Sequence, residues 1–307
     1  LINAGEIENK GIEIALNTRP IELKDFSWDL NLNFSKNSNK VKKLVDGMDM
    51  FELEKAAWLD VQVAAKVGEN FGAIVGPDFK RNENGDILID PQTGLPQYDK
   101  SNHVLGNASW DWTGGLGTTL TYKNLSLSAL FDIKVGADLY SMSARASYES
   151  GKSKETLAGR EEWYRSEEQR QAAGIAKGSP DWTPTGGFIA PGVIDNGDGT
   201  YRPNDIYINP EDYWMSVCRN APSMFIYDNS YVKCRELTLS YRVPNKLFKG
   251  VIDNMTVSFV ARNPFIVYKN IPNIDPDSNY NNTTGMGLEY GSLPSRRSYG
   301  FNVNLKF

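Results

Sequence analysis

The sequence predicts an all-β fold, a transmembrane antiparallel β-barrel whose long loops contain short helices. Three observations predict it. Several segments alternate strictly between apolar and polar residues, the period of a strand with one apolar face. These segments are close to the 9 to 11 residues with which a tilted strand crosses a hydrocarbon core. The connections between them are alternately short and long, as they must be if each strand crosses a slab once.

The composition is compatible with such a barrel. With 307 residues, a net charge of −5 and a mean hydropathy of −0.46, the chain looks like an ordinary acidic soluble protein. No run approaches 18 apolar residues, which excludes a spanning helix. Transmembrane strands alternate apolar and polar residues, so a barrel also looks hydrophilic on average. The acidic balance gives no reason to expect nucleic acid as a partner.

Seven segments carry the alternation. In chain order they are 7–18, 26–37, 112–122, 125–139, 231–243, 252–262 and 297–307. The fourth is the clearest, since every odd position from Leu125 to Leu139 is apolar. On this face we expect lipid contact from Leu127, Phe131, Ile133 and Val135, with Ser128 facing the lumen.

Aromatic residues on these segments are candidates for the girdles at the two membrane interfaces, or else ordinary inward-facing aromatics of a soluble sheet. They are Trp28, Trp112, Tyr122 and Tyr299.

The lengths of the connections predict sidedness. Those at 19–25, 123–124 and 244–250 are tight, whereas those from 38 to about 109, 141 to about 229 and 264 to about 294 are long. Short turns are periplasmic and long loops extracellular in such barrels. Because Phe307 falls on the side of the tight turns, the carboxy-terminus is predicted to be periplasmic.

The long connections are predicted to be only partly regular. The region 38–109 permits zero or two additional crossings. Residues 154–176 have helical composition, whereas 181–205 are rich in the Gly, Pro and Asp of loops.

The faces opposite the apolar ones supply candidates for the lumen wall. They are Asp132, Lys134, Asp138, Glu236, Arg242 and Arg262. In 231–243 the same parity puts Lys233 and Arg235 on the outward face near the outer interface, where they could pair with a lipid phosphate or snorkel into water.

The two cysteines leave two alternatives open. Parity puts Cys234 on the lumen side, where a disulfide to Cys218 in the adjoining loop is one possibility and two unrelated thiols the other.

The long connections concentrate aromatic residues that suit sugar stacking or an interface with a partner, or that pack the loops on each other. These candidate binding residues are Trp163, Tyr164, Trp182, Tyr213, Trp214, Tyr280 and Tyr290.

Catalytic and metal motifs find no support. The chain has one histidine, His103, and no CxxC, so neither a zinc site nor a His-based triad is indicated. "DNGDGT" at 195–200 and "KRNENGDILID" at 80–90 lack the ligand spacing of a calcium loop and suggest ordinary turns. We therefore expect no enzyme activity, no metal and no cofactor.

Six stretches together resemble one family in its order along nearly the whole chain. They are "LGNASWDWTGGLGTTLTYKNLSLSALFDIKVGADLYS", "KETLAGREEWY", "APGVI", "YVKCRELTLSYRVPNKLF", "ARNPFIVYKN" and "SLPSRRSYGFNVNLKF". They resemble the barrel of SusC/RagA-type TonB-dependent outer-membrane transporters. The chain departs from it at Cys234, where relatives tend to carry Leu.

The resemblance implies a 22-strand barrel of which 1–307 is the C-terminal part, with seven to nine strands. The plug, the TonB box and the signal sequence are expected outside this sequence. Phe307 would close the terminal strand that the outer-membrane assembly machinery recognises.

The resemblance further implies a SusD-type surface lipoprotein as a lid, the TonB complex acting through the N-terminal part, contact with outer-membrane lipids, and possible dimers of transporter–lipoprotein pairs. The function expected is active import of oligosaccharides or oligopeptides. A passive porin-like channel and a surface β-rich binding module are the alternatives.

Overall fold

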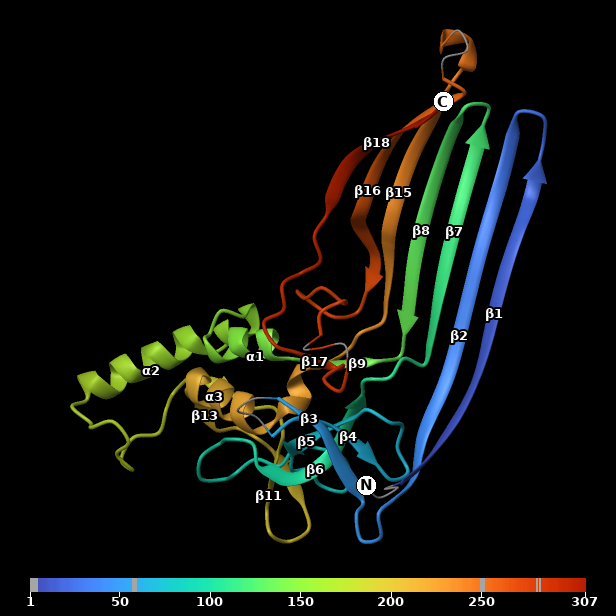
Figure 1. Ribbon diagram of the computed structural model, residues 1–307. Helices are drawn as coiled ribbons and strands as arrows, with labels where there is room; N and C mark the ends of the chain where they lie inside the picture. Colours follow the sequence, from blue (N-terminus) through green and yellow to red (C-terminus); the bar gives the residue numbers. More distant parts are fainter. Residues whose placement is uncertain (1–4, 57–59, 249–251, 280, 282) are drawn as a thin grey trace.

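A wall of seven antiparallel strands dominates the structure. The computed structural model describes residues 5–56, 60–248, 252–279, 281 and 283–307 (Figure 1). The strand order is β1-β2-β7-β8-β15-β16-β18. The bounds are β1 Gly5–Glu22, β2 Phe26–Leu44, β7 Trp112–Tyr122, β8 Leu125–Val135, β15 Tyr231–Val243, β16 Asn254–Lys269 and β18 Ser298–Lys306. All seven predicted segments are confirmed as strands of this sheet.

One face of the wall is apolar because the alternating positions are in register from strand to strand. The pairings Trp28–Leu120, Leu120–Leu127, Leu127–Leu239, Leu239–Phe259 and Phe259–Phe301 form a continuous apolar row across six strands. Many of these side chains are exposed, Phe301 by 81%. A continuous exposed apolar surface of this extent is unusual for a soluble monomer and needs an apolar environment.

The opposite face carries hydroxyl and amide side chains in equally regular rows. Thr119 and Ser128 lie 2.9 Å apart between their hydroxyl oxygens, and Ser240 and Ser258 lie 2.8 Å apart. These cross-strand hydrogen bonds satisfy polar groups on a half-buried surface. The wall is therefore two-faced along its whole width.

The tight turns and the long connections lie at opposite ends of the wall (Figure 1). The carboxy-terminus lies at the end of the tight turns (Figure 1). The long connections 45–111, 136–230 and 270–297 pack together at the other end into a region here called the cap. Its core draws on all three connections, as the cluster of Ile74, Tyr140, Phe225 and Leu288 shows.

The cap contains small sheets and helices of its own. A four-stranded sheet joins β3 Met50–Lys55, β4 Gln62–Lys66, β5 Ala73–Phe79 and β6 Tyr98–Asn107. Since these strands are separate from the wall, the described part of 38–109 adds no crossing. Short pairs join β10 Phe188–Ile189 with β13 Tyr207–Ile208 and β11 Val193–Asp195 with β12 Tyr201–Pro203, and a third sheet joins β14 Ile226–Asp228, β9 Asp138–Ser141 and β17 Leu288–Glu289.

Three α-helices lie in the middle connection. They are α1 Met142–Glu149, α2 Arg160–Ala172 and α3 Pro210–Asn220. The helix predicted within 154–176 is confirmed as α2, preceded by the 3₁₀ turn η1 Lys154–Leu157. Two further 3₁₀ turns are η2 Pro222–Phe225 and η3 Asn245–Phe248. No helix among the described residues is long and apolar enough to span a membrane.

The fourth segment is shorter than its alternation predicts. β8 ends at Val135, and Gly136 follows with φ of 89°, a left-handed conformation that favours glycine. The chain then turns away from the wall, so Leu139 is buried in the core of the cap. The strand predicted over 125–139 is therefore confirmed only as far as Val135.

A β-bulge overturns the predicted orientation of two basic side chains. The pairing of β15 skips Arg235 on both its neighbours, with a register shift between Cys234 and Glu236. A bulge adds one residue and reverses the parity of what precedes it. Lys233 is consequently paired with Asp132 on the polar face, and Cys234 with Phe131 on the apolar face. The predictions of outward cations and of a lumen-side Cys234 are wrong.

Both cysteines are buried and free. Cys218 lies in the core of the cap, whereas Cys234 lies within the wall. The structure thus agrees with the alternative of two unrelated thiols.

Candidate functional site

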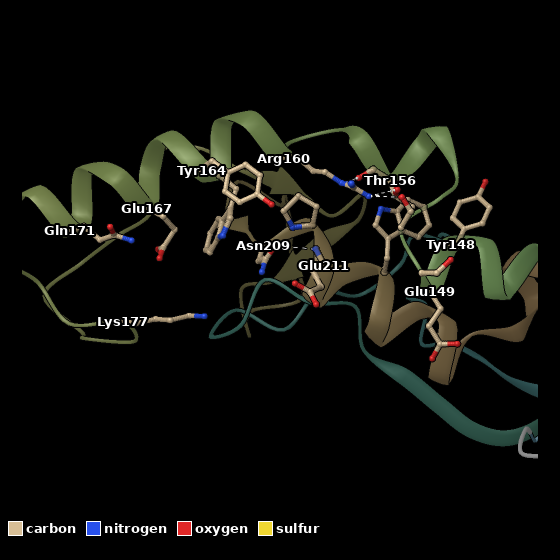
Figure 2. A pocket seen from close by; sticks show the side chains of 15 residues that line it. Tyr148, Glu149, Thr156, Arg160, Tyr164, Glu167, Gln171, Lys177, Asn209 and Glu211 are labelled. Carbon is tan, nitrogen blue, oxygen red and sulfur yellow. Dashed lines mark hydrogen bonds between the residues drawn. The ribbon is translucent and has the colours of Figure 1, made fainter.

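A cavity of about 480 Å³ opens in the cap beneath α2 (Figure 2). Its lining comes from the end of α1, from η1 and α2, from the loop after α2, and from the start of α3. Its residues are Tyr148, Glu149, Ser150, Gly151, Thr156, Arg160, Trp163, Tyr164, Glu167, Gln171, Lys177, Asn209, Pro210, Glu211 and Trp214. Its volume lies within the range of small-ligand pockets.

Local sequence signals fix the helices that build this cavity. Ser141 caps α1 by accepting a hydrogen bond from the backbone N–H of Ala144. Asn209 caps α3 by accepting one from the backbone N–H of Glu211, and Pro210 occupies the first turn, where its missing N–H costs nothing. Gly159 precedes α2 with φ of 78° and lies so close to Gly187 that a side chain would clash.

Arginine side chains hold the walls of the cavity in place. Arg160 donates to the carbonyl oxygens of Gly151 at 2.9 Å and Thr156 at 2.7 Å, tying α2 back to the turn before it. Arg145, a buried residue on α1, donates to the carbonyl oxygen of Cys218 on α3 at 2.7 Å. Because guanidinium groups donate in several directions at once, each arginine joins two elements.

The charges around the cavity are nearly balanced. Glu149 pairs with Arg145 at 3.1 Å, and Glu167 pairs with Arg170 at 2.9 Å. The hydrogen bond from Arg170 lowers the pKa of Glu167, which keeps this carboxylate ionised. The other lining charges include Lys177 and Glu211, of opposite sign; Figure 2 shows Glu167 on α2 and Lys177 on the loop below it. The lining thus favours neither a strongly anionic nor a strongly cationic ligand.

Aromatic rings provide the apolar part of the lining. Tyr148 and Trp214 lie with their ring centroids 4.8 Å apart, and burial raises the pKa of Tyr148. Trp163 is half-buried and Tyr164 is exposed, whereas Trp214 is buried and reaches the cavity with only 8% of its surface exposed. Such rings can stack on a sugar ring or on a side chain of a protein partner.

Of the predicted loop aromatics, the structure brings three to the cavity: Trp163, Tyr164 and Trp214. Tyr213 is instead a core residue, 3% exposed, packed on Phe188 with ring centroids 4.6 Å apart. Its burial removes it from the surface candidates and raises its pKa to about 12.

The remaining predicted aromatics lie elsewhere or are not described. Trp182 and Tyr290 are half-buried away from the cavity lining. Tyr280 lies outside the described residues.

Much of the cavity lining has no signal in the sequence. Tyr148, Arg160 and Lys177 have no individual signal in the sequence. α1 has only eight residues, too few for helical periodicity to reveal it. The Asn209-Pro210 pair followed by acidic residues is a helix-start signal that could have identified α3.

A second polar cluster lies where the wall meets the cap. Lys233 is 1% exposed, and its Nζ lies 3.1 Å from Oδ1 of Asp275 and 2.5 Å from Oδ2 of Asp277. Arg235 contacts Asp277 and Asp132. A buried cation of this kind requires such carboxylates, because an unpaired charge would be costly to bury.

Most of the predicted lumen candidates share the polar face of the wall. Asp132 faces Lys233, and Glu236 lies opposite Arg262, with 3.5 Å between Oε2 of Glu236 and Nε of Arg262. Lys134 lies opposite Tyr231, and Arg242 opposite Thr256.

Asp138 differs from them, because it lies in β9 of the cap, where it accepts a hydrogen bond from the backbone N–H of Asn107. Its place on a lumen wall is therefore corrected.

The described residues hold no group of three or more His, Cys, Asp or Glu side chains arranged for a metal ion. At 195–200 the carboxylate oxygens are used within the turn, since Asp195 accepts from the backbone N–H of Gly197 at 2.7 Å. At 80–90 the amide oxygen of Asn82 accepts from the N–H groups of Asn84 and Asp86.

Sequence comparison places curated relatives alongside this chain, although no family model matches it. TonB-dependent receptor P3 of Formosa agariphila is 26% identical over 99% of this chain and 29% of its own length. TonB-dependent receptor SusC of Bacteroides thetaiotaomicron is 24% identical over 99% of this chain and 27% of its own length. The chain therefore spans under a third of the length of these relatives.

Structural comparison gives the same fold. A solved structure described as the RagAB peptide transporter has a TM-score of 0.64 at 19% identity, covering 99% of this chain and 30% of that one. Another, described as the RagAB peptide importer in the open-open state, has a TM-score of 0.62 at 20% identity over 99% of this chain and 29% of that one. In sequence and in fold, the chain is similar to SusC/RagA-type TonB-dependent transporters. These relatives are named as receptors and transporters rather than as enzymes.

Proposed function

We propose that this chain is the C-terminal part of the barrel of a TonB-dependent importer in the bacterial outer membrane. Its seven-stranded wall forms part of the barrel, with the apolar face against lipid and the polar face toward the lumen. The long connections lie outside the cell, and the tight turns and Phe307 lie in the periplasm.

The two-faced wall is the observation that carries this proposal. An apolar face that spans the whole width of the sheet needs lipid or a protein core against it. Within the described residues, the cap packs at the end of the wall and leaves the apolar face uncovered (Figure 1). This favours lipid over a protein core as the partner of that face. The similarity to TonB-dependent receptors over 99% of the chain favours lipid.

Both edges of the wall support the idea that the barrel continues beyond this sequence. β1 and β18 are the outermost strands of the described sheet. Open strand edges leave backbone groups without partners, and in hydrocarbon each such group costs several kcal/mol. β18 would therefore pair with the first strand of the barrel, and β1 with the strand that precedes it.

The cap is the part of the chain that would meet cargo and a SusD-type lipoprotein. The accessible rings of Trp163 and Tyr164 combine with a charge-balanced lining, which suits an uncharged or zwitterionic ligand such as a glycan or a peptide. Asp132, Lys134, Glu236, Arg242 and Arg262 would line the lumen. Energy would come from the TonB complex through an N-terminal segment outside this sequence, and pairs of transporter and lipoprotein could dimerise.

Uptake by cells that produce the full-length protein tests this function. Cells would be supplied with labelled oligosaccharides or oligopeptides as the sole source of carbon, with and without a functional TonB complex. We expect uptake of at least one cargo class, lost when the gene or TonB is deleted.

Two other outcomes would favour other functions. Uptake that persists without TonB would identify a passive porin-like channel. A full-length protein that stays in the aqueous phase without detergent and lacks heat-modifiable gel mobility would identify a soluble or surface binding module.

A further inference from the structure

The connection 270–297, here called the strap, is pinned to the wall at its base. Lys233 of β15 contacts Asp275 and Asp277 as described above, and its Nζ lies 2.5 Å from Oγ of Ser295. The carboxylates come from the first arm of the strap and the hydroxyl from the last, so one buried lysine holds both arms.

The two arms are also joined to each other. Oδ2 of Asp275 accepts a hydrogen bond from the backbone N–H of Ser295 at 2.8 Å. Arg235 adds a second cation, which contacts Asp277 of the strap and Asp132 of the wall. The hydroxyl of Tyr231 donates to Asp277 at 3.0 Å and accepts from Arg235 at 3.0 Å. The base of the strap is therefore a closed network of two cations, three carboxylates and two hydroxyls.

The far part of the strap is built into the cap. β17 pairs in parallel with β9, placing Glu289 beside Ser141. The carboxylate of Glu289 is 1% exposed and accepts from the hydroxyls of Ser141 at 2.7 Å and Ser143 at 2.6 Å. It also accepts from the backbone N–H of Ser143 at 3.1 Å.

These contacts place a buried anion at the start of α1. Ser143 is in the first turn of the helix, and Ser141 is its cap. A carboxylate there satisfies an otherwise unpaired N–H group and interacts favourably with the helix dipole. Displacement of the Glu289 carboxylate would therefore loosen the first turn of α1.

The opposite end of α1 lines the cavity. Tyr148 and Glu149 occupy its last turn, and the ring of Tyr148 packs on Trp214 of α3. A continuous path thus runs from Lys233 in the wall, through the strap, to α1 and the cavity.

We propose that Lys233 is a positioning residue that couples the wall to the cavity through the strap. The lysine fixes the strap, Glu289 of the strap fixes the start of α1, and α1 fixes Tyr148 and Glu149. A movement of the wall at β15 is thereby transmitted to the cavity, and occupation of the cavity to the wall. The role of the cavity as a binding site rests on the proposed function, whereas the coupling itself is measured in α1.

Hydrogen exchange in the full-length protein in detergent tests this coupling. The variants are Lys233→Met, which removes the charge at the base of the strap, and Glu289→Gln, which weakens the cap of α1. Both should speed exchange of the amides in 144–149, about fivefold or more if the coupling has an ordinary magnitude. Arg262→Met is the matched control, because Arg262 lies on the same polar face with its side chain mostly exposed and pairs with Glu236 rather than with the strap.

The region of faster exchange decides between coupling and a local role. If Lys233→Met speeds exchange in 270–297 and leaves 144–149 unchanged, the proposal is wrong. Should Lys233→Met fail to assemble, Ser295→Ala removes one contact of the lysine together with the hydrogen bond from the Ser295 hydroxyl to Asp275, and it must give the same pattern at smaller amplitude. Exchange is measured without cargo, so its result is independent of whether the uptake experiment supports import.

Discussion

Lys233 and Arg235 show how one inserted residue changes the environment of a charge. Strict alternation puts both on the face of Leu237, where a cation would meet lipid. The bulge at Arg235 moves both to the polar face, where carboxylates of the strap and of β8 surround them. The sequence contains a hint of this, because two cations on a lipid-facing strand are costly. It contains no local signal for the bulge itself.

The carboxylates of the strap predict how its base responds to acid. Burial acts to raise the pKa of Asp277, but hydrogen bonds and charges from Arg235 and Lys233 outweigh it and hold the pKa well below the usual range. The pKa of Asp275 is also lowered, against the effect of burial, with hydrogen bonds from Ser295 contributing most. A carboxyl group whose pKa is lowered in the folded state stabilises that state at pH values above its ordinary pKa of about 3.9. This stabilisation is lost as the pH falls through the pKa of the folded state.

We therefore expect hydrogen exchange in 270–297, corrected for its intrinsic pH dependence, to stay constant from pH 7 to about pH 4. It should rise only in stronger acid. The groups that face the carboxylates of Asp275 and Asp277 are Lys233, Arg235, Asp132, Tyr231 and Ser295. None of them is a histidine that would titrate near neutrality. Loosening that begins above pH 5 in the wild-type protein would contradict this assignment.

The cysteines give a simple test of the packing around them. Burial raises the pKa of the Cys218 thiol to about 12, so little reactive thiolate is present at neutral pH. We expect both Cys218 and Cys234 to resist alkylation in the folded protein and to react fully after unfolding without reductant. Mass spectrometry measures this. A peptide pair linked through the two cysteines in the non-reduced digest would show that they form a disulfide.

Among the elements, the seven strands of the wall were predictable, because each alternates over about the length of a membrane crossing. The ends of these strands were less predictable. β1 and β2 continue beyond the predicted ranges into mainly polar residues, where pairing with a neighbour rather than apolar alternation maintains the strand. β16 continues to Lys269 through the consecutive apolar residues Phe265 to Tyr268, which do not alternate with polar ones. β8 stops early, because Gly136 adopts a left-handed conformation that alternation cannot reveal.

Neighbouring residues of β8 give a matched test of the two faces. Ala129 is paired with Leu237 on the apolar face, whereas Ser128 is paired with Thr238 on the polar face. Both side chains are small and lie near the middle of the strand. Ala129→Arg should cost about 2 to 4 kcal/mol if that face meets lipid near the midplane, and Ser128→Arg much less.

The readout is the yield of heat-modifiable full-length protein in the outer membrane. We expect a strong reduction for Ala129→Arg and near wild-type yield for Ser128→Arg. Equal yields from the two variants, or the reverse order, would show that the faces are wrongly assigned.

On the scale of the whole molecule, the sequence predicted which parts would be wall and which would be loop, but not how the loops pack. The cavity joins Tyr148 to Trp214 across 66 residues, a proximity that depends on the tertiary structure of the cap. Composition marked Trp163, Tyr164 and Trp214 as candidates. It could not separate them from Tyr213, because only the tertiary structure shows that the ring of Tyr213 packs inward on Phe188.

The architecture implies that the wall divides two compartments. The cap lies at one end of every strand, and the tight turns lie at the other (Figure 1). If the wall crosses the outer membrane, residues at the two ends must differ in their access to reagents outside the cell. Tyr164 on α2 and Lys24 in the first tight turn are exposed positions at opposite ends.

Labelling of these two positions in intact cells tests whether the wall crosses the outer membrane with the cap outside the cell. Tyr164→Cys and Lys24→Cys would each be introduced into the full-length protein and exposed to a membrane-impermeant maleimide, with wild type as control for the buried native cysteines. We expect Tyr164→Cys to react in intact cells and Lys24→Cys to react only after the outer membrane is breached. Labelling of both positions in intact cells, or of Lys24→Cys alone, would contradict this expectation.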